Sequence, residues 1–251
     1  MEILESIRNK KPIVHSITNP VTINDCAGVL VAVGASPIMA HHKIEVAEVT
    51  ANAAALVLNL GATDDYEAMH ISLKSANEKK IPVVVDPVGV ATSSYRRKQA
   101  LSLIEASDKM CIRGNYSEIF SLVENKSLSA GLDNRLKKEE LELEPILKFA
   151  VSNKILILMS GSADYIFDGI NGKIMSVETG EKKSMLVDIT GSGCILSGLV
   201  GAALSTEYSA QALVEIAKEY RLVGDDATAV SEGPYEFKSK FIDKLYRNSL
   251  K

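Results

Sequence analysis

The chain has 251 residues, of which 46% are hydrophobic and 24% charged, so its composition is that of a globular protein and excludes disordered and collagen-like classes. Its 28 basic and 32 acidic residues leave a formal net charge of −4, which gives no electrostatic reason to expect nucleic acid as a partner. Three scattered cysteines and no CxxC pair argue against a zinc ribbon or a dithiol redox site and suit the reducing cytosol, so we expect a cytoplasmic protein.

Short apolar runs recur along the chain, each ending in polar or glycine residues, and helical spacing follows most of them. We predict strands at Pro12–Ile17, Ser36–Ala40, Ala55–Gly61, Pro82–Pro87, Met110–Arg113 and Ile155–Ser160. These runs show little alternation of polar and apolar residues, which is typical of strands that are buried on both faces of a parallel sheet.

Helical spacing lies between and after these runs. We predict helices at Asp65–Lys79, Arg96–Ala106 and Pro145–Val151, another from Ile195 onward, and two or more in Ala210–Leu250, divided by the turn at Gly233-Pro234. The polar segment Glu124–Glu144 is expected to be a surface loop that leads into a solvated helix. The alternation of strands and helices predicts an α/β fold whose mainly parallel central sheet is covered by helices on both faces. Because neither a further linker nor a repeat is seen, we expect a single domain over residues 1–251.

Two uncharged stretches must be compared with a membrane span, which takes about 20 mostly apolar residues. The stretch Cys26–Ala40 is shorter than this and is interrupted by Gly34 and Pro37, whereas Ile189–Thr206 begins with polar and glycine residues. We therefore predict that both are buried elements of the core, and we expect no membrane partner.

The strongest local signal is Asp188-Ile-Thr-Gly-Ser-Gly-Cys194, a loop of small residues that leads directly into helical spacing. Backbone N–H groups at the start of a helix lack partners and attract anions, so the loop predicts a phosphate site. The alternative is a plain tight turn into a buried helix. The loop lacks the GxxxxGK[ST] pattern, the third glycine of a dinucleotide fingerprint and a GxSxG elbow, which argues against P-loop NTPases, typical dehydrogenases and serine hydrolases.

Polar residues follow the fourth and fifth predicted strands, and ligands of open α/β sheets bind at the carboxyl ends of strands. Asp86, held by Pro87, would bind Mg²⁺ or instead make a turn hydrogen bond. Arg113 carries a fork of donors that suits phosphate. Asn115 and Glu118 would share one face of a helix and hold a hydrated Mg²⁺, or instead form a capping box at the helix start.

Cys194 also has two interpretations. A thiol at a helix N-terminus has a lowered pKa, so Cys194 would act as a weak base. The alternative, which is the better one for the residue taken alone, is a buried and inert cysteine that shapes a pocket. The sequence by itself leaves both open.

Taken together, these segments resemble the hydroxyethylthiazole kinases of the ribokinase-like superfamily over nearly the whole chain. The segments VHSITNPVTINDCAGVLVAVGASPIMA, LVLNLG, PVVVDPVG, IRGNYSEI and DITGSGC follow in the order and spacing of that family. TGSGC is the specific part, because most of the superfamily carries Asp where this chain has Cys194. The resemblance implies a ribokinase-like fold and the Mg²⁺-dependent, in-line transfer of phosphate from ATP to the hydroxyethyl group of 4-methyl-5-(2-hydroxyethyl)thiazole, in thiamine biosynthesis or salvage. It also implies a homotrimer with sites at the subunit interfaces.

The residues and the resemblance together give a set of candidate site residues. They are Gly191, Gly193 and Cys194 for catalysis, Met39, Gly191, Asn19 and Asn24 for the thiazole substrate, Arg113, Asn115 and Ser160 for ATP, and Asp86 and Glu118 for Mg²⁺.

The chain departs from the family pattern at several positions. Ser160 stands where threonine is usual, and Gly161-Ser162 replaces Gly-Glu, which removes a carboxylate from the nucleotide side. Val90-Ala91-Thr92 lacks a glycine that commonly follows DPVG, and Pro20 and Gly28 are unusual on the substrate side. These departures leave two alternatives open, a ribokinase-like kinase for a related small alcohol and a non-catalytic protein that binds nucleotide or thiazole.

Overall fold

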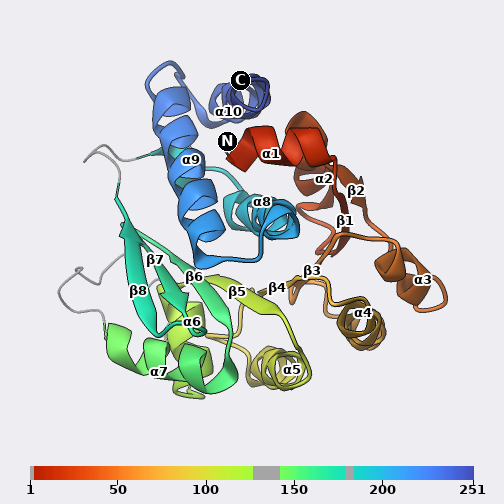
Figure 1. Ribbon diagram of the computed structural model, residues 1–251. Helices are drawn as coiled ribbons and strands as arrows, with labels where there is room; N and C mark the ends of the chain where they lie inside the picture. The colour runs from red at the N-terminus through yellow and green to blue at the C-terminus, as the bar shows by residue number, and fades with distance from the viewer. Residues whose placement is uncertain (1–2, 127–141, 179–183) are drawn as a thin grey trace.

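A computed structural model describes residues 3–126, 142–178 and 184–251. Most of the polar segment Glu124–Glu144, for which a surface loop was expected, lies outside these ranges. The strands are β1 (Ile13–Ile17), β2 (Ser36–Ile38), β3 (Ala55–Asn59), β4 (Val83–Asp86), β5 (Met110–Asn115), β6 (Leu156–Ser160), β7 (Asp164–Asp168) and β8 (Lys173–Val177). They form one sheet in the order β2-β1-β3-β4-β5-β6-β7-β8 (Figure 1).

The six predicted strands are confirmed as β1 to β6, and the pairings among these six strands are all parallel. The antiparallel hairpin β7–β8 beyond them was not predicted. Strand β7 has an apolar run of only three residues between Asp164 and Asp168, and most of β8 is exposed at the end of the sheet. Neither strand therefore shows the longer apolar run that marks a strand buried on both faces.

The helices are α1 (Ile3–Lys10), α2 (Ile23–Ala32), α3 (Val46–Ala51), α4 (Tyr66–Lys79), α5 (Ser94–Glu105), α6 (Tyr116–Val123), α7 (Leu143–Asn153), α8 (Ser192–Thr206), α9 (Ala210–Thr228) and α10 (Pro234–Asn248), with the 3₁₀ turn η3 at Met185–Val187. The predicted helices are confirmed within a few residues, and Pro234 begins α10 as its turn signal indicated. The short helices α1, α2 and α3 were not predicted. They have six to ten residues, a length at which packing rather than local propensity stabilises a helix.

Helices cover both faces of the sheet, as the sequence predicted (Figure 1). Helices α1, α2, α8, α9 and α10 contribute to one buried cluster and α3 to α7 to the other. Successive residues of β3 alternate between them, so that Val57 joins the first cluster while Leu56 and Leu58 join the second. Helix α8 lies at the centre of the first face, and every residue from Ile195 to Leu204 is buried.

The stretch Ile189–Thr206, one of the two compared with a membrane span, is mostly α8 and therefore belongs to this core. Among the residues that the structure describes, none of the helices combines the length and the apolar composition that crossing a bilayer requires.

We predict opposite stability effects for the same substitution at two helical glycines. A Cβ at Gly201 of α8 would lie 2.7 Å from the Val57 side chain, so Gly201→Ala forces α8 away from β3 and lowers the free energy of unfolding by about 1–3 kcal/mol. Gly28 of α2 has open space at this position, so Gly28→Ala raises that free energy by about 0.5–1 kcal/mol. Urea unfolding of both variants checks the pair, and an equal effect at the two positions would contradict the close approach of α8 to β3.

Candidate functional site

The candidate residues gather where the carboxyl ends of the central strands meet the first turn of α8. Asn59 ends β3 and Asp86 ends β4, and the two are register partners in the sheet. Cys194, in the first turn of α8, accepts hydrogen bonds through its Sγ from the amides of Asn59, at 3.2 Å, and Asn19, at 3.5 Å. The structure therefore brings together four segments that lie apart in the sequence.

Two glycines at the start of α8, one at the N-cap and one in the first turn, lie close to other side chains. Gly191 is the N-cap residue and has a φ of 82°, in the left-handed region, and a Cβ there would lie 2.5 Å from the methyl group of Thr22. A Cβ at Gly193 would lie 2.5 Å from Nη1 of Arg113. The backbone at the start of α8 is thus open to a close neighbour, and a guanidinium group already lies against it.

The Cys194 thiol lies in a setting that disfavours its charged form. Burial raises the pKa of Cys194, and the nearby negative charge of Asp86 raises it further, whereas hydrogen bonds from Asn59 and Asn19 lower it. The net shift is upward, so the expectation of a lowered pKa at a helix N-terminus was wrong, because burial and a like charge outweigh the helix dipole. At neutral pH the residue is a neutral thiol.

Asp86 is a buried carboxylate whose two oxygens differ. Its side chain is 1% exposed, and its Oδ2 accepts hydrogen bonds from Nδ2 of Asn59, at 3.0 Å, and Oγ of Ser197, at 2.7 Å. Its Oδ1 is buried and has no hydrogen-bond partner among the described residues. Burial raises the pKa of Asp86, and the positive charge of Arg113 acts in the opposite direction. The carboxylate is therefore oriented with one oxygen saturated and the other available.

Asn59 and Ser197 are site residues to which no role was assigned from the sequence. Asn59 has every hydrogen-bonding position of its amide filled, because its Oδ1 also accepts from the backbone N–H of Gly61, at 2.9 Å, and from Asn19, at 3.2 Å. The position of Asn59 near the end of a predicted strand was the sequence signal that could have identified it as a site residue. Ser197 carried no such signal, because a serine among the small residues of a buried helix looks like a packing residue.

Arg113 and Ser160 lie side by side on the neighbouring strands β5 and β6. Nη2 of Arg113 donates a hydrogen bond to Oγ of Ser160 at 2.5 Å, and Arg113 as a whole residue is 8% exposed. Nε of Arg113 is buried and has no hydrogen-bond partner among the described residues. A buried cation with unused donors beside a helix N-terminus suits an anion such as phosphate.

Asn115 and Glu118 form the capping box that was the alternative to a metal-binding pair. Oδ1 of Asn115 accepts from the Glu118 backbone at 2.9 Å, and Oε2 of Glu118 accepts from the Asn115 backbone at 3.1 Å. Oε1 of Glu118 accepts from the N–H of Gly89 at 3.2 Å. Burial raises the pKa of Glu118 to about 7, and the negative charge of Asp86 adds to the rise. In the described ranges, no group of three or more His, Cys, Asp or Glu side chains is arranged to hold a metal.

The predicted substrate-side residues separate into two environments. Asn19 is buried in the site, whereas Asn24 is exposed on the first turn of α2. Met39 follows β2, is half-buried and packs against the cluster that contains α8. Within one chain, Asn19 is therefore the residue of this set that contacts Cys194 through a hydrogen bond.

The turn between β6 and β7 contains the departure at Ser162. The side chain of Ser162 is exposed, but its carbonyl oxygen and that of Gly161 accept hydrogen bonds from Arg221 on α9. Nη1 of Arg221 also lies 3.4 Å from Oδ1 of the buried Asp164. The turn is therefore held by a buried ion pair, without a carboxylate at position 162.

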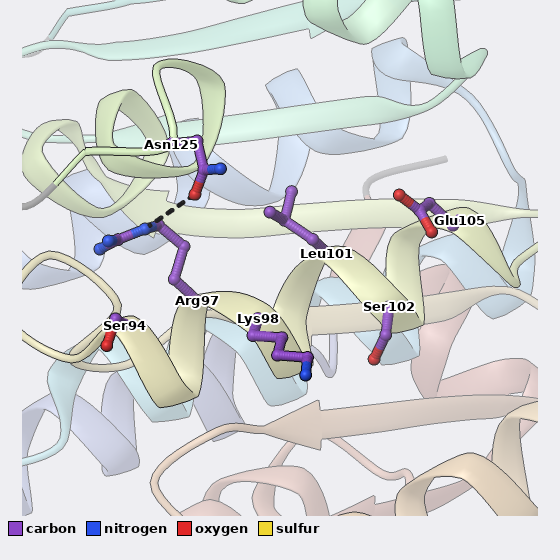
Figure 2. A pocket seen from close by; sticks show the side chains of 7 residues that line it. All are labelled: Ser94, Arg97, Lys98, Leu101, Ser102, Glu105 and Asn125. Carbon is purple, nitrogen blue, oxygen red and sulfur yellow. Dashed lines mark hydrogen bonds between the residues drawn. The ribbon is translucent and has the colours of Figure 1, made fainter.

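A hollow of about 360 Å³ lies elsewhere, along α5 (Figure 2). It is lined by α5 residues such as Lys98 and Glu105 together with Asn125, which accepts a hydrogen bond from Arg97. None of the candidate site residues lines it, so its position gives no support for a ligand of the site at the strand ends.

Comparison with known proteins identifies a family. The model of the hydroxyethylthiazole kinase family matches residues 4–250. The hydroxyethylthiazole kinase of Thermoanaerobacter pseudethanolicus is 36% identical, with coverage of 98% of this chain and 93% of the relative, and that of Pyrococcus abyssi is 33% identical, with coverage of 98% and 92%.

Solved structures agree with these relatives. A hydroxyethylthiazole kinase protein from Pyrococcus horikoshii OT3 superposes with a TM-score of 0.85 at 29% identity, covering 98% of this chain and 91% of the other. A ribokinase-like superfamily protein from Enterococcus faecalis V583 superposes with a TM-score of 0.69 at 13% identity, covering 98% and 94%, which supports the fold alone. The predicted ribokinase-like α/β fold is confirmed.

We predict that the free energy of unfolding of the ligand-free protein falls as the pH rises from 4.5 to about 7. The folded state holds the Glu118 proton more tightly than the unfolded state, so this stabilisation is complete below pH 4.5 and is lost through about pH 7. Glu118→Gln keeps the capping box and reduces the dependence of the free energy of unfolding on pH. Part of this dependence remains in the variant, because the pKa of Asp86 is also raised.

Urea unfolding between pH 4.5 and 7.5, with chelator present, measures this slope. Glu144→Gln is the matched control, because Glu144 lies exposed in the first turn of α7. Equal slopes in Glu118→Gln and the parent protein would contradict the assignment.

Proposed function

This chain belongs to the hydroxyethylthiazole kinase family, and we propose that the residues around the first turn of α8 carry out its phosphotransfer. The activity is the phosphorylation of hydroxyethylthiazole in thiamine metabolism, with ATP as the phosphate donor. The proposal is supported above all by the meeting of Asp86, Arg113 and Cys194 at one helix N-terminus.

The phosphates of ATP would bind between Arg113 and the loop from Gly191 to Cys194. The first backbone N–H groups of α8 have no partners within the helix, and the helix dipole favours negative charge there. The guanidinium of Arg113 lies against Gly193 and keeps Nε unused among the described residues. Ser160 holds this guanidinium in place, and Asn115 orders the neighbouring helix start.

The acceptor alcohol would bind on the side of Asn19 and Met39, next to Cys194. The reaction forms a bond between the hydroxyethyl oxygen and the γ-phosphorus and breaks the bond from that phosphorus to the bridging oxygen, so that ADP leaves and the hydroxyl proton is released. The transition state of such transfers is loose in most analyses, so positioning and charge stabilisation dominate over base strength. A neutral thiol at Cys194 is compatible with that chemistry, and the backbone N–H groups of Gly191 to Cys194 would stabilise the charge on the transferred group.

The residues present fit a hydrated Mg²⁺, since Oδ1 of Asp86 is buried and has no hydrogen-bond partner in the described part of the chain. Glu118 lies close enough to Asp86 for each charge to affect the other, although both of its oxygens already accept backbone N–H groups. Asp86 would therefore hold the ion, through water or directly, and Glu118 would support it by charge. A bound Mg²⁺ neutralises phosphate charge.

The assembly is also part of the proposal. We propose one domain over residues 1–251, because a single sheet carries both core clusters, and a cytoplasmic protein, because its three cysteines are free. We further propose a homotrimer whose sites lie at subunit interfaces. Val21 and Ile44 are 73% and 83% exposed, and Asn24, three residues after Val21, is exposed as well, which suits a surface that a second subunit covers.

We predict ADP release that depends on 4-methyl-5-(2-hydroxyethyl)thiazole when the purified protein is given ATP and Mg²⁺. A coupled ADP assay with and without the thiazole, together with mass spectrometry of the product, measures this. A folded protein that binds ATP and releases no thiazole-dependent ADP would contradict the proposed substrate and favour another small alcohol or a binding role.

We predict that Cys194→Ala keeps measurable turnover and that Cys194→Asp keeps or raises it. The physical reason is that a loose transition state needs little help from a base, and the neutral thiol supplies little. Steady-state kinetics on both variants check this. Complete loss of turnover in a well-folded Cys194→Ala protein would show that the thiol takes an essential part.

A further inference from the structure

Ser197 lies one turn beyond Cys194 on α8 and connects this helix to β4. Its hydroxyl donates a hydrogen bond to Oδ2 of Asp86 at 2.7 Å, and its side chain is 1% exposed. We propose that Ser197 is a positioning residue for the phosphotransfer, because this bond holds the first turn of α8 against the end of β4. The inference rests on the proposed function of that turn.

Ser197 does not need Asp86 as a partner. The carbonyl oxygen of Gly193, four residues earlier in the same helix, lies 3.2 Å from its hydroxyl and is an alternative acceptor. Ser205, further along α8, is an example of a serine bonded only within the helix. Among the described residues, its hydroxyl donates only to the Ala202 carbonyl, at 2.6 Å. The bond to Asp86 is shorter than the one to Gly193 and has a carboxylate acceptor, so it is the stronger of the two.

Asp86, in contrast, does need Ser197. A buried carboxylate is costly unless donors compensate its charge, and the hydrogen bonds that Ser197 and Asn59 donate to Asp86 both converge on Oδ2. Asn59 also donates to Sγ of Cys194. Asp86, Asn59, Cys194 and Ser197 thus form a closed ring of contacts that includes one turn of α8.

This ring determines where the helix N-terminus points. Asn59 holds the helix at Cys194 and Ser197 holds it one turn later, so together they fix both its distance from β4 and its rotation about its own axis. Without the hydroxyl, the contacts of Asn59 and Asn19 with Cys194 remain, but the first turn loses its hydrogen bond to the end of β4 and is held less firmly against it. When a transfer depends on alignment of the reacting atoms, a misplacement of about 1 Å can lower its rate by about a hundredfold.

The test compares Ser197→Ala with Ser205→Ala, the same change on the same helix at a hydroxyl that bonds only within it. We expect Ser197→Ala to lower kcat by about tenfold or more, with KM for the thiazole changed less than about threefold, since the loss lies in alignment and not in thiazole contacts. We expect both constants of Ser205→Ala to stay within about twofold of the parent. Rates are expressed per folded molecule, with the folded fraction measured by circular dichroism.

A second measurement does not depend on activity. Cys194 is half-buried while Cys26 and Cys111 are buried, so alkylation by iodoacetamide at one fixed pH reports on the first turn of α8. We expect Ser197→Ala to speed alkylation of Cys194 by about threefold or more, because the turn opens more often, and Ser205→Ala to leave it unchanged. Mass spectrometry of the peptide that contains Cys194 gives the rate.

The outcomes separate this inference from the proposed function. An alkylation rate of Ser197→Ala within twofold of the parent, or a loss of kcat no greater than in Ser205→Ala, overturns the inference. A parent protein without thiazole-dependent turnover overturns the proposed function, and faster alkylation in Ser197→Ala then still supports Ser197 as the residue that positions the turn. A lower unfolding midpoint with unchanged kcat and alkylation shows a purely structural serine and also overturns it.

Discussion

The burial of the Asp86 carboxylate is the constraint on which the arrangement of this site depends. A carboxylate that is 1% exposed destabilises a fold unless nearby donors and positive charge compensate it. Here the compensation comes from three directions, with Asn59 on β3, Ser197 on α8 and the positive charge of Arg113 on β5. One charge therefore requires three elements to meet, and these elements carry the candidate phosphate and substrate residues.

The packing of α8 makes that meeting possible. Gly201 leaves no room for a Cβ beside Val57, so the helix lies closer to the sheet than a helix with larger side chains would. Its buried length from Ile195 to Leu204 anchors it, while Gly191 and Gly193 leave the half-buried backbone at its N-terminus open to close neighbours. The same helix is a core element at one end and an anion-binding element at the other, which explains why small residues fill it.

Much of this fold could be predicted from the sequence, because strands buried on both faces appear as apolar runs whose ends carry the polar residues. Asp86 and Arg113 were identified in this way. Ser197 was not, because its partner lies 111 residues away in the sequence and a buried serine has the same local pattern whether it packs or donates. The hairpin β7–β8 was missed for a different reason, since its strands lack a long apolar run.

The Cys194 thiol shows the limit of arguments from local position. Its place at a helix start suggested a lowered pKa, but the sequence could not show that Asp86 and a buried setting would lie beside it and reverse the shift. The interpretation of Asn115 and Glu118 was limited in the same way. Their spacing fits both a capping box and a metal-binding pair. The structure shows the capping box, and the Gly89 backbone, whose position the sequence could not give, donates to the other oxygen of Glu118.

The double use of Glu118 links ligand binding to the local fold. Its two oxygens hold the N–H groups of Asn115 and Gly89, which begin α6 and order the loop after β4. Each oxygen keeps a second lone pair, so a cation near this carboxylate would share its charge with the two backbone groups. A substitution at position 118 would therefore alter the charge of the site and the anchoring of two backbone segments at the same time.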